Sequence, residues 1–204
     1  MKTLFAAVGC AAVLAAPAYA ELNLNPYVGL NLAYSNAQLN HDYLDDMVNE
    51  NHMGIDFNIG VQFNQYFAVE GFIQKLFESD KVKKFSGDDE QKIKTSAIAY
   101  GVDAIGSYPI SDSKFSVLGT LGLGYYDMTA KLQYYDAVLD EYDRDEASQE
   151  EVGFRFGIGA QYAFSEKISA RIMARYIMLN SDEDDGEDLI KGFTEISLGA
   201  RYNF

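Results

Sequence analysis

The last thirteen residues, Gly192 to Phe204, read GFTEISLGARYNF and alternate between two kinds of side chain. The even positions are mostly apolar or aromatic: Thr194, Ile196, Leu198, Ala200, Tyr202 and Phe204. The odd positions are mostly polar, charged or small: Phe193, Glu195, Ser197, Gly199, Arg201 and Asn203. Successive side chains of a β-strand point to opposite faces, so this period of two predicts a strand with one apolar face.

The same period of two recurs along the chain from residue 26 onward. It is clearest over residues 54–64, 153–164 and 168–178, and weaker versions cover residues 26–35, 67–77, 95–108 and 115–126. With the last strand these make about eight segments, each near the roughly 9–11 residues of a tilted membrane-spanning strand. The exceptions are Phe72, Leu118, Met173 and Ile177 on the polar face and Lys75 on the apolar face.

The connections between these segments alternate between short and long. Residues 64–66, 109–113 and 165–167 are short turns, and residues 36–52, 78–92, 127–151 and 180–189 are long loops. An outer-membrane barrel has short turns on its periplasmic side and longer loops outside, whereas a soluble sandwich has no reason to sort its loops. We therefore predict an all-β fold, a closed antiparallel up-and-down transmembrane β-barrel of about eight strands.

The polar face carries four acids, four arginines and no lysine, although the chain has a formal net charge of −15. A buried charge that is not paired costs several kcal/mol, and the planar fork of arginine can bridge carboxylates. Glycines such as Gly157, Gly159 and Gly199 would make room for long side chains in a narrow lumen. We predict a lumen charge network of Asp56, Glu70, Asp103, Arg155, Arg171, Arg175, Glu195 and Arg201.

Aromatic residues gather near the short turns, which is typical of a girdle at the membrane interface. The predicted girdle on this side consists of Tyr27, Phe67, Tyr108, Phe115, Phe164, Tyr202 and Phe204.

The first twenty residues are typical of a cleaved secretory signal. Lys2 gives a positive start, an apolar stretch follows, and Ala18-Tyr19-Ala20 supplies the cleavage pattern. We predict a signal peptide over residues 1–20 and one barrel domain over residues 21–204. Cys10, the only cysteine, lies in the signal, so the mature chain would have no thiol for disulfides, metal binding or catalysis.

In these features the sequence resembles the small outer-membrane barrels: the OmpA transmembrane domain, OmpX, Ail and the wider outer membrane protein beta-barrel domain group. The resemblance rests on the architecture, on the ending Arg201-Tyr202-Asn203-Phe204, and on the strand sequences LGLGYY (121–126) and GIGAQY (157–162). It implies an exported, multi-pass barrel in the outer membrane. It also implies that Tyr202 and Phe204 form the assembly signal for the barrel-assembly machinery.

Other constellations could carry chemistry. Gly122-x-Gly124 and Gly157-x-Gly159 lie mid-strand with no helix after them, which argues against dinucleotide binding. The two histidines, His41 and His52, fall in the first long loop, where a solvated loop is the favoured interpretation over a metal or hydrolytic site. The acidic run of residues 182–188 lacks the spacing of an EF-hand, which leaves a self-repelling loop or loose divalent-cation binding.

We therefore expect a non-enzymatic barrel without cofactor, metal site or catalytic residue. Its lumen would be filled by side chains, and its long acidic loops would serve surface contact, adhesion or envelope integrity. Expected partners are outer-membrane lipid and lipopolysaccharide, the assembly machinery, and a host or surface ligand at the loops. The acidic balance argues against nucleic acid, and we expect a monomer. The alternatives are a small porin-like channel and a barrel enzyme acting on lipid A or phospholipid.

Overall fold

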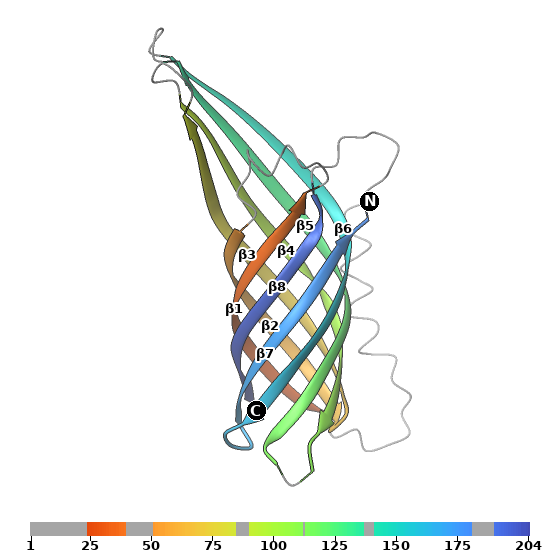
Figure 1. The fold of residues 1–204 in the computed structure, drawn as a ribbon. Helices are drawn as coiled ribbons and strands as arrows, with labels where there is room; N and C mark the ends of the chain where they lie inside the picture. The colour runs from red at the N-terminus through yellow and green to blue at the C-terminus, as the bar shows by residue number, and fades with distance from the viewer. Residues whose placement is uncertain (1–23, 40–50, 85–89, 112, 137–140, 181–189) are drawn as a thin grey trace.

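The computed structural model describes residues 24–39, 51–84, 90–111, 113–136, 141–180 and 190–204. They form eight strands: β1 (Asn25–Leu39), β2 (Asn51–Asn64), β3 (Phe67–Lys84), β4 (Glu90–Pro109), β5 (Phe115–Asp136), β6 (Glu141–Ala163), β7 (Ile168–Leu179) and β8 (Ile190–Asn203). Each strand pairs antiparallel with the next, and β1 pairs with β8 to close the barrel (Figure 1). The predicted fold class is confirmed.

No helix in the described part of the chain has both the length and the apolar character that crossing a membrane would require. The predicted signal peptide, residues 1–20, lies outside the described residues.

The two faces of β8 separate as the sequence predicts. Ile196 and Leu198 are 55% and 61% exposed on the outer surface, whereas Glu195 is 1% exposed in the lumen. A closed barrel satisfies its backbone hydrogen bonds between strands, so lipid can cover an apolar outer face without leaving polar groups unpaired. The outer face of β8 is therefore suited to contact with lipid.

The three predicted short turns are confirmed, and local side chains contribute to all of them, with the Ser113 hydroxyl bonding to Ile110 and Phe115 in the turn between β4 and β5. The Asn64 side-chain oxygen accepts hydrogen bonds from the backbone N–H groups of Tyr66 and Phe67, at 2.8 and 2.9 Å. The Ser165 hydroxyl oxygen accepts from the N–H groups of Lys167 and Ile168. Asparagine and serine favour turns because their short side chains bond the backbone two or three residues ahead. We call this side of the barrel the turn end and the opposite side the hairpin end.

The expected long loops at residues 78–92 and 127–151 were wrong in extent. In the structure β3, β4, β5 and β6 continue through most of them, with lengths of 18, 20, 22 and 23 residues. Figure 1 shows these four strands rising together beyond the other four. The pairing continues to Lys84↔Glu90 and Asp136↔Glu141. Beyond the membrane the outer face need not be apolar, so the alternation fades while the backbone ladder continues.

The exceptions on the polar face are lumen-filling residues. Phe72, Leu118, Met173 and Ile177 are all at most 6% exposed. They belong to two groups of buried apolar side chains, which we call the turn-end cluster and the hairpin-end cluster. The turn-end cluster is Tyr27, Ala68, Ile105, Leu118 and Met173. The hairpin-end cluster is Ala37, Phe72, Leu76, Ala97, Ala99, Tyr126, Met128, Ile177, Leu179 and Phe193.

The placement of Tyr27 in the aromatic girdle was wrong. Its side chain is 0% exposed and belongs to the turn-end cluster. Its position in β1 has the same parity as Asn31 and Ser35, which are both buried in the lumen at 1% exposure. The other predicted girdle residues lie on the outer surface with exposures of 41–71%: Phe67, Tyr108, Phe115, Phe164, Tyr202 and Phe204.

Candidate functional site

The candidate site is the polar interior of the barrel, where six strands contribute the eight charged residues singled out above. Asp56 lies on β2, Glu70 on β3, Asp103 on β4, Arg155 on β6, Arg171 and Arg175 on β7, and Glu195 and Arg201 on β8. Each is at most 7% exposed. Strand parity brings them together, because every one of them occupies an inward-facing position of its strand.

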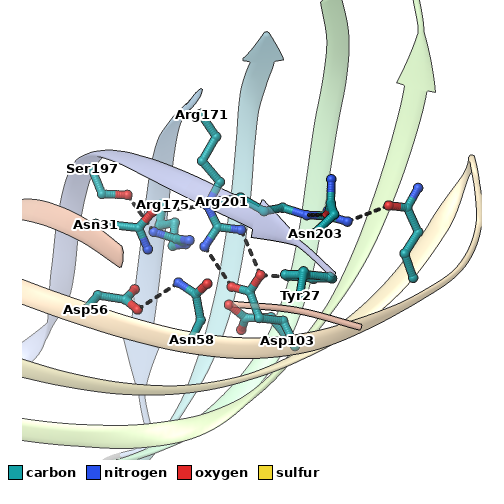
Figure 2. A network of polar contacts seen from close by, with 12 residues as sticks. Tyr27, Asn31, Asp56, Asn58, Asp103, Arg171, Arg175, Ser197, Arg201 and Asn203 are labelled. Atoms are coloured by element: carbon teal, nitrogen blue, oxygen red, sulfur yellow. Dashed lines mark hydrogen bonds and ion pairs between the residues drawn. The ribbon is translucent and has the colours of Figure 1, made fainter. Parts of the chain in front are cut away.

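Arg171 and Glu70 form the most complete pair of the lumen. The Nη1 and Nη2 atoms of Arg171 donate to the two carboxylate oxygens of Glu70, both at 2.8 Å. The Tyr27 hydroxyl donates to the same carboxylate at 3.0 Å, and Arg171 Nε donates to the side-chain oxygen of Asn31 at 3.1 Å. In Figure 2 the Arg171 side chain extends into the lumen, in the region of Tyr27. This two-point contact ties β7 to β3, on opposite sides of the barrel.

Arg175 and Glu195 form a second pair nearer the hairpin end. Arg175 Nη1 donates to Glu195 Oε1 at 3.0 Å and to the Ser197 hydroxyl at 2.7 Å. The other oxygen of Glu195 accepts from Ser35 and from Gln74. The Glu195 carboxylate thus has three donors from β1, β3 and β7. Such complete satisfaction offsets the desolvation of a buried charge.

The remaining charges are less completely paired. Arg155 Nε lies 3.7 Å from Asp103 Oδ1, and its guanidinium stacks 3.6 Å from the ring centre of Phe72. Asp56 accepts a hydrogen bond from Asn58 at 3.2 Å.

Arg201 has only neutral contacts among the described residues. It donates to Asn203 at 2.8 Å and to Gln62 at 2.5 Å, and its guanidinium lies 3.5 Å from the ring centre of Tyr27. Four acids therefore do not match four arginines one to one, since ion pairs join three of the arginines to acids and Arg201 to none.

Neutral polar residues of the lumen escaped the sequence prediction, which selected charged residues only. Tyr27, Asn31, Ser35, Gln74 and Ser197 all donate to or accept from a charged member. Their signal was in the sequence, because each has the inward parity of its strand. The sequence did not show which of these side chains contact each other across the lumen, because those contacts depend on the register of strands far apart in the chain.

Two glycines make room for the polar groups. A Cβ atom on Gly122 would overlap the carboxylate of Asp103, and one on Gly199 would overlap the amide of Asn31. Of the three glycines expected to make room for long side chains, Gly157 leaves space for Arg175 and Thr120, Gly159 for Met173, and Gly199 for the shorter Asn31. These close approaches hold the side chains of Asp103 and Asn31 against the backbone of the neighbouring strand.

His52 was expected in a solvated loop, which is wrong. It is the second residue of β2 and its side chain is 5% exposed inside the barrel. Its Nδ1 lies 3.4 Å from the Phe77 carbonyl oxygen and its Nε2 lies 3.3 Å from the Thr95 hydroxyl. The reason is again parity, because His52 is in phase with Asp56 and Asn58. His41 and the acidic run of residues 182–188 lie outside the described residues.

Within the described ranges, no group of three or more His, Cys, Asp or Glu residues is arranged to hold a metal ion. On β7 and β3 the inward-facing charged residues lie between apolar ones. On β7, Met173 separates Arg171 from Arg175, and Ile177 and Leu179 follow toward the hairpin end. On β3, Ala68 precedes Glu70 and Leu76 follows it. The two apolar clusters thus flank the ionic layer toward its two ends, where their side chains narrow the path for water and ions.

Comparison with known proteins identifies this architecture. The model of the family described as outer membrane protein beta-barrel domain matches residues 4–204. The chain belongs to this family. The resemblance to the small outer-membrane barrels and the predicted outer-membrane localisation are thereby confirmed. Among the curated proteins no sequence matches the chain.

Solved structures of outer-membrane proteins share the fold at low sequence identity. Neisserial surface protein A is 15% identical with a TM-score of 0.58, and the match covers 88% of this chain and 97% of that one. A major outer membrane protein from Thermus thermophilus is 12% identical with a TM-score of 0.58, covering 89% and 100%. The N-terminal β-barrel domain of Pseudomonas aeruginosa OprF is 12% identical with a TM-score of 0.50, covering 86% and 97%.

Proposed function

We propose that this family member is a non-enzymatic, monomeric outer-membrane barrel with a closed, charge-paired lumen. In this proposal its four long strands display a contact surface outside the cell for adhesion or for envelope integrity. The observation that carries the proposal is the unequal length of the strands. β5 and β6 have 22 and 23 residues, whereas β7 has 12.

β5 and β6 are longer than a strand needs to be to cross the membrane. A tilted strand crosses the bilayer in roughly 9–11 residues, so β5 and β6 each have about 11 residues to spare. At about 3.3 Å per residue and a tilt of about 40°, that excess rises about 28 Å beyond the membrane. The acidic segment of residues 134–151 falls largely within this extension, so the proposed contact surface is acidic.

The outer face of the barrel becomes polar where the extension begins. Lys94 forms an ion pair with Glu78 there, and the Tyr125 hydroxyl donates to Glu150. At two edges the extended sheet also continues past the neighbouring strand in the described part of the chain. β6 pairs with β7 only from Gly153 onward, and β3 pairs with β2 only up to Leu76. An exposed strand edge of this kind can pair with an extended segment of another molecule.

The side chains that fill the barrel interior favour the proposal over a channel. Three ion pairs at most 3% exposed lie inside it, one of them between the opposite strands β7 and β3, and the two apolar clusters flank them. The position of His52 supports a non-enzymatic role, because its ring faces the lumen rather than the lipid. In the same proposal Tyr202 and Phe204, which stack edge to face at 5.5 Å, serve as the assembly signal.

A shortened variant tests the contact surface. Lys131 and Glu146 face each other in the β5–β6 ladder, so residues 132–145 can be replaced by an Asn-Gly turn that joins them. Lys81 and Ile93 allow the same replacement of residues 82–92 in the β3–β4 hairpin, as a matched control of similar size. Each variant is expressed in a non-adherent Gram-negative host, and heat-modifiable gel mobility verifies that the barrel is folded.

Two readouts separate the branches of the proposal. Attachment of the cells to matrix-coated surfaces should fall to the level of the empty host when the acidic β5–β6 extension is removed, if the surface serves adhesion. Detergent sensitivity should rise instead, if the surface serves envelope integrity. Host cells that behave alike with the parent protein, the variants and no protein would overturn the proposal.

A further inference from the structure

A small cavity of about 20 Å³ opens at the turn end of the lumen. Its polar lining comes from Gln62, Ser107, Gln161, Arg171 and Arg201, and Leu118 contributes to its apolar wall. In outer-membrane barrels the short turns face the periplasm, so the cavity lies at the periplasmic mouth. Figure 2 shows Arg171 and Arg201, the two cations of this lining, close to Tyr27.

The charge around the cavity does not balance. Glu70 is the carboxylate nearest to this region by its contacts, and Arg171 already engages both of its oxygens. Arg201 is 7% exposed, and none of the described carboxylates lies within ion-pair distance of it. Its contacts are the neutral oxygens of Gln62 and Asn203 and the face of Tyr27. A largely buried cation of this kind is costly unless an anion accompanies it.

The cavity is also lined by groups that can donate further hydrogen bonds. A guanidinium has five N–H groups, and the hydrogen bonds to Asn203 and Gln62 use one Nε and one Nη2 donor of Arg201. The Ser107 hydroxyl and the Gln161 amide add further donors to the lining. Since roughly 10–15 Å³ accommodates one water molecule, the cavity fits one small occupant and is too small for a phosphate or sulfate.

We propose that this cavity binds one small monovalent anion of the size of chloride, held by Arg201 with Ser107 and Gln161. The anion would supply the negative charge that Arg201 lacks, at a place open to the periplasm. The proposal is independent of what the extended strands contact outside the cell.

Bromide replaces chloride and can be located by its anomalous scattering. Crystals of the refolded, full-length barrel grown in sodium bromide should show one anomalous peak within hydrogen-bond distance of the Arg201 guanidinium. A cavity that contains only water under these conditions overturns the proposal.

A solution measurement uses the parent protein and two variants. The urea midpoint of the parent should be higher in sodium chloride than in sodium gluconate at equal ionic strength, and the difference should saturate with chloride concentration. Gln161→Glu places a carboxylate in the cavity at nearly constant size, and it should abolish the difference. Lys114→Gln removes an exposed cation of the same end, whose Nζ contacts only the Phe164 carbonyl among the described residues, and it should retain the difference.

Each contrary result counts against the anion site. A parent without chloride dependence, or a Gln161→Glu variant with the full dependence, contradicts the proposal. If Gln161→Glu does not fold, the bromide position in the parent decides alone.

Discussion

Replacing Arg171 with methionine should destabilise the barrel strongly, because Arg171 has three hydrogen bonds in the lumen. Two go to Glu70 at 2.8 Å and one goes to Asn31 at 3.1 Å. Methionine fills much of the same space but makes none of these bonds. Glu70, at 1% exposure, would keep only the Tyr27 hydroxyl as a donor.

The expected magnitude follows from the uncompensated carboxylate that remains. Removing one partner of a buried ion pair costs about 3–5 kcal/mol. With a slope of about 2 kcal/mol per molar urea, the unfolding midpoint should fall by roughly 2 M. The assay is urea unfolding of the protein refolded into lipid vesicles, followed by the ratio of folded to unfolded bands on an unheated gel.

A double variant distinguishes the pair from general packing damage. Arg171→Met combined with Glu70→Leu removes both charges, and an apolar replacement of a whole buried pair is often neutral or stabilising. The double variant should therefore recover most of the lost midpoint, and Lys114→Met at the turn end should leave the midpoint unchanged. An unshifted midpoint in Arg171→Met, or a double variant no more stable than the single one, would refute an enclosed ion pair.

Three further changes test the faces, the close packing and the assembly signal. Leu198→Arg, at a site 61% exposed in the middle of the lipid-facing side of β8, should cost about 2–4 kcal/mol in vesicle unfolding. Thr194→Arg, nearer the hairpin end of the same face, should cost about 0–1 kcal/mol, and equal costs would contradict the membrane placement. Gly122→Ala should cost about 1–3 kcal/mol, since its Cβ would overlap Asp103 and lie 2.6 Å from the Val102 carbonyl oxygen. Gly119→Ala, with nothing within 4 Å, should leave the urea midpoint near that of the parent, and a matching loss there would remove the steric explanation. Deletion of Phe204 should lower the amount of heat-modifiable barrel in the outer membrane, and a normal amount would reject the assembly-signal role.

The membrane-spanning part of the fold could be predicted because its two faces meet different environments, lipid outside and polar side chains inside. Lipid requires an apolar outer face, and the narrow lumen gathers the polar side chains. Ile196 and Glu195 accordingly lie on opposite faces of β8, as their neighbouring positions in the sequence predict. The short turn at Asn64 could be predicted equally well, because the asparagine that closes it bonds only to nearby backbone.

The extensions of β5 and β6 could not be predicted on the same basis. Past Met128, the last buried residue described on β5, both faces of the strand are at least partly exposed, so neither face has to be apolar and period two disappears. The residues Lys131 and Glu146 gave no strand signal, although their backbones are paired. A polar, acidic stretch of this kind has the composition of a loop, which explains the error at residues 127–151.

Within the lumen, the sequence predicted which side chains point inward but not which ones meet. Arg171 pairs with Glu70 at a separation of 101 residues, and only the closed register of the barrel brings β3 and β7 face to face. Tyr27 shows the limit of composition alone. An aromatic residue near a turn resembles a girdle residue, yet parity with Asn31 places it inside, beside Glu70 and Arg201.

The central claim is that ion pairs, flanked by an apolar cluster toward each end of the barrel, close the lumen. Single-channel recording of the refolded, full-length protein in planar lipid bilayers tests it most directly. The closed lumen predicts a baseline without discrete conductance steps across the voltage range that the bilayer tolerates. Regular, reproducible steps that disappear when the protein is heat-denatured before addition would show a continuous water path and contradict the claim.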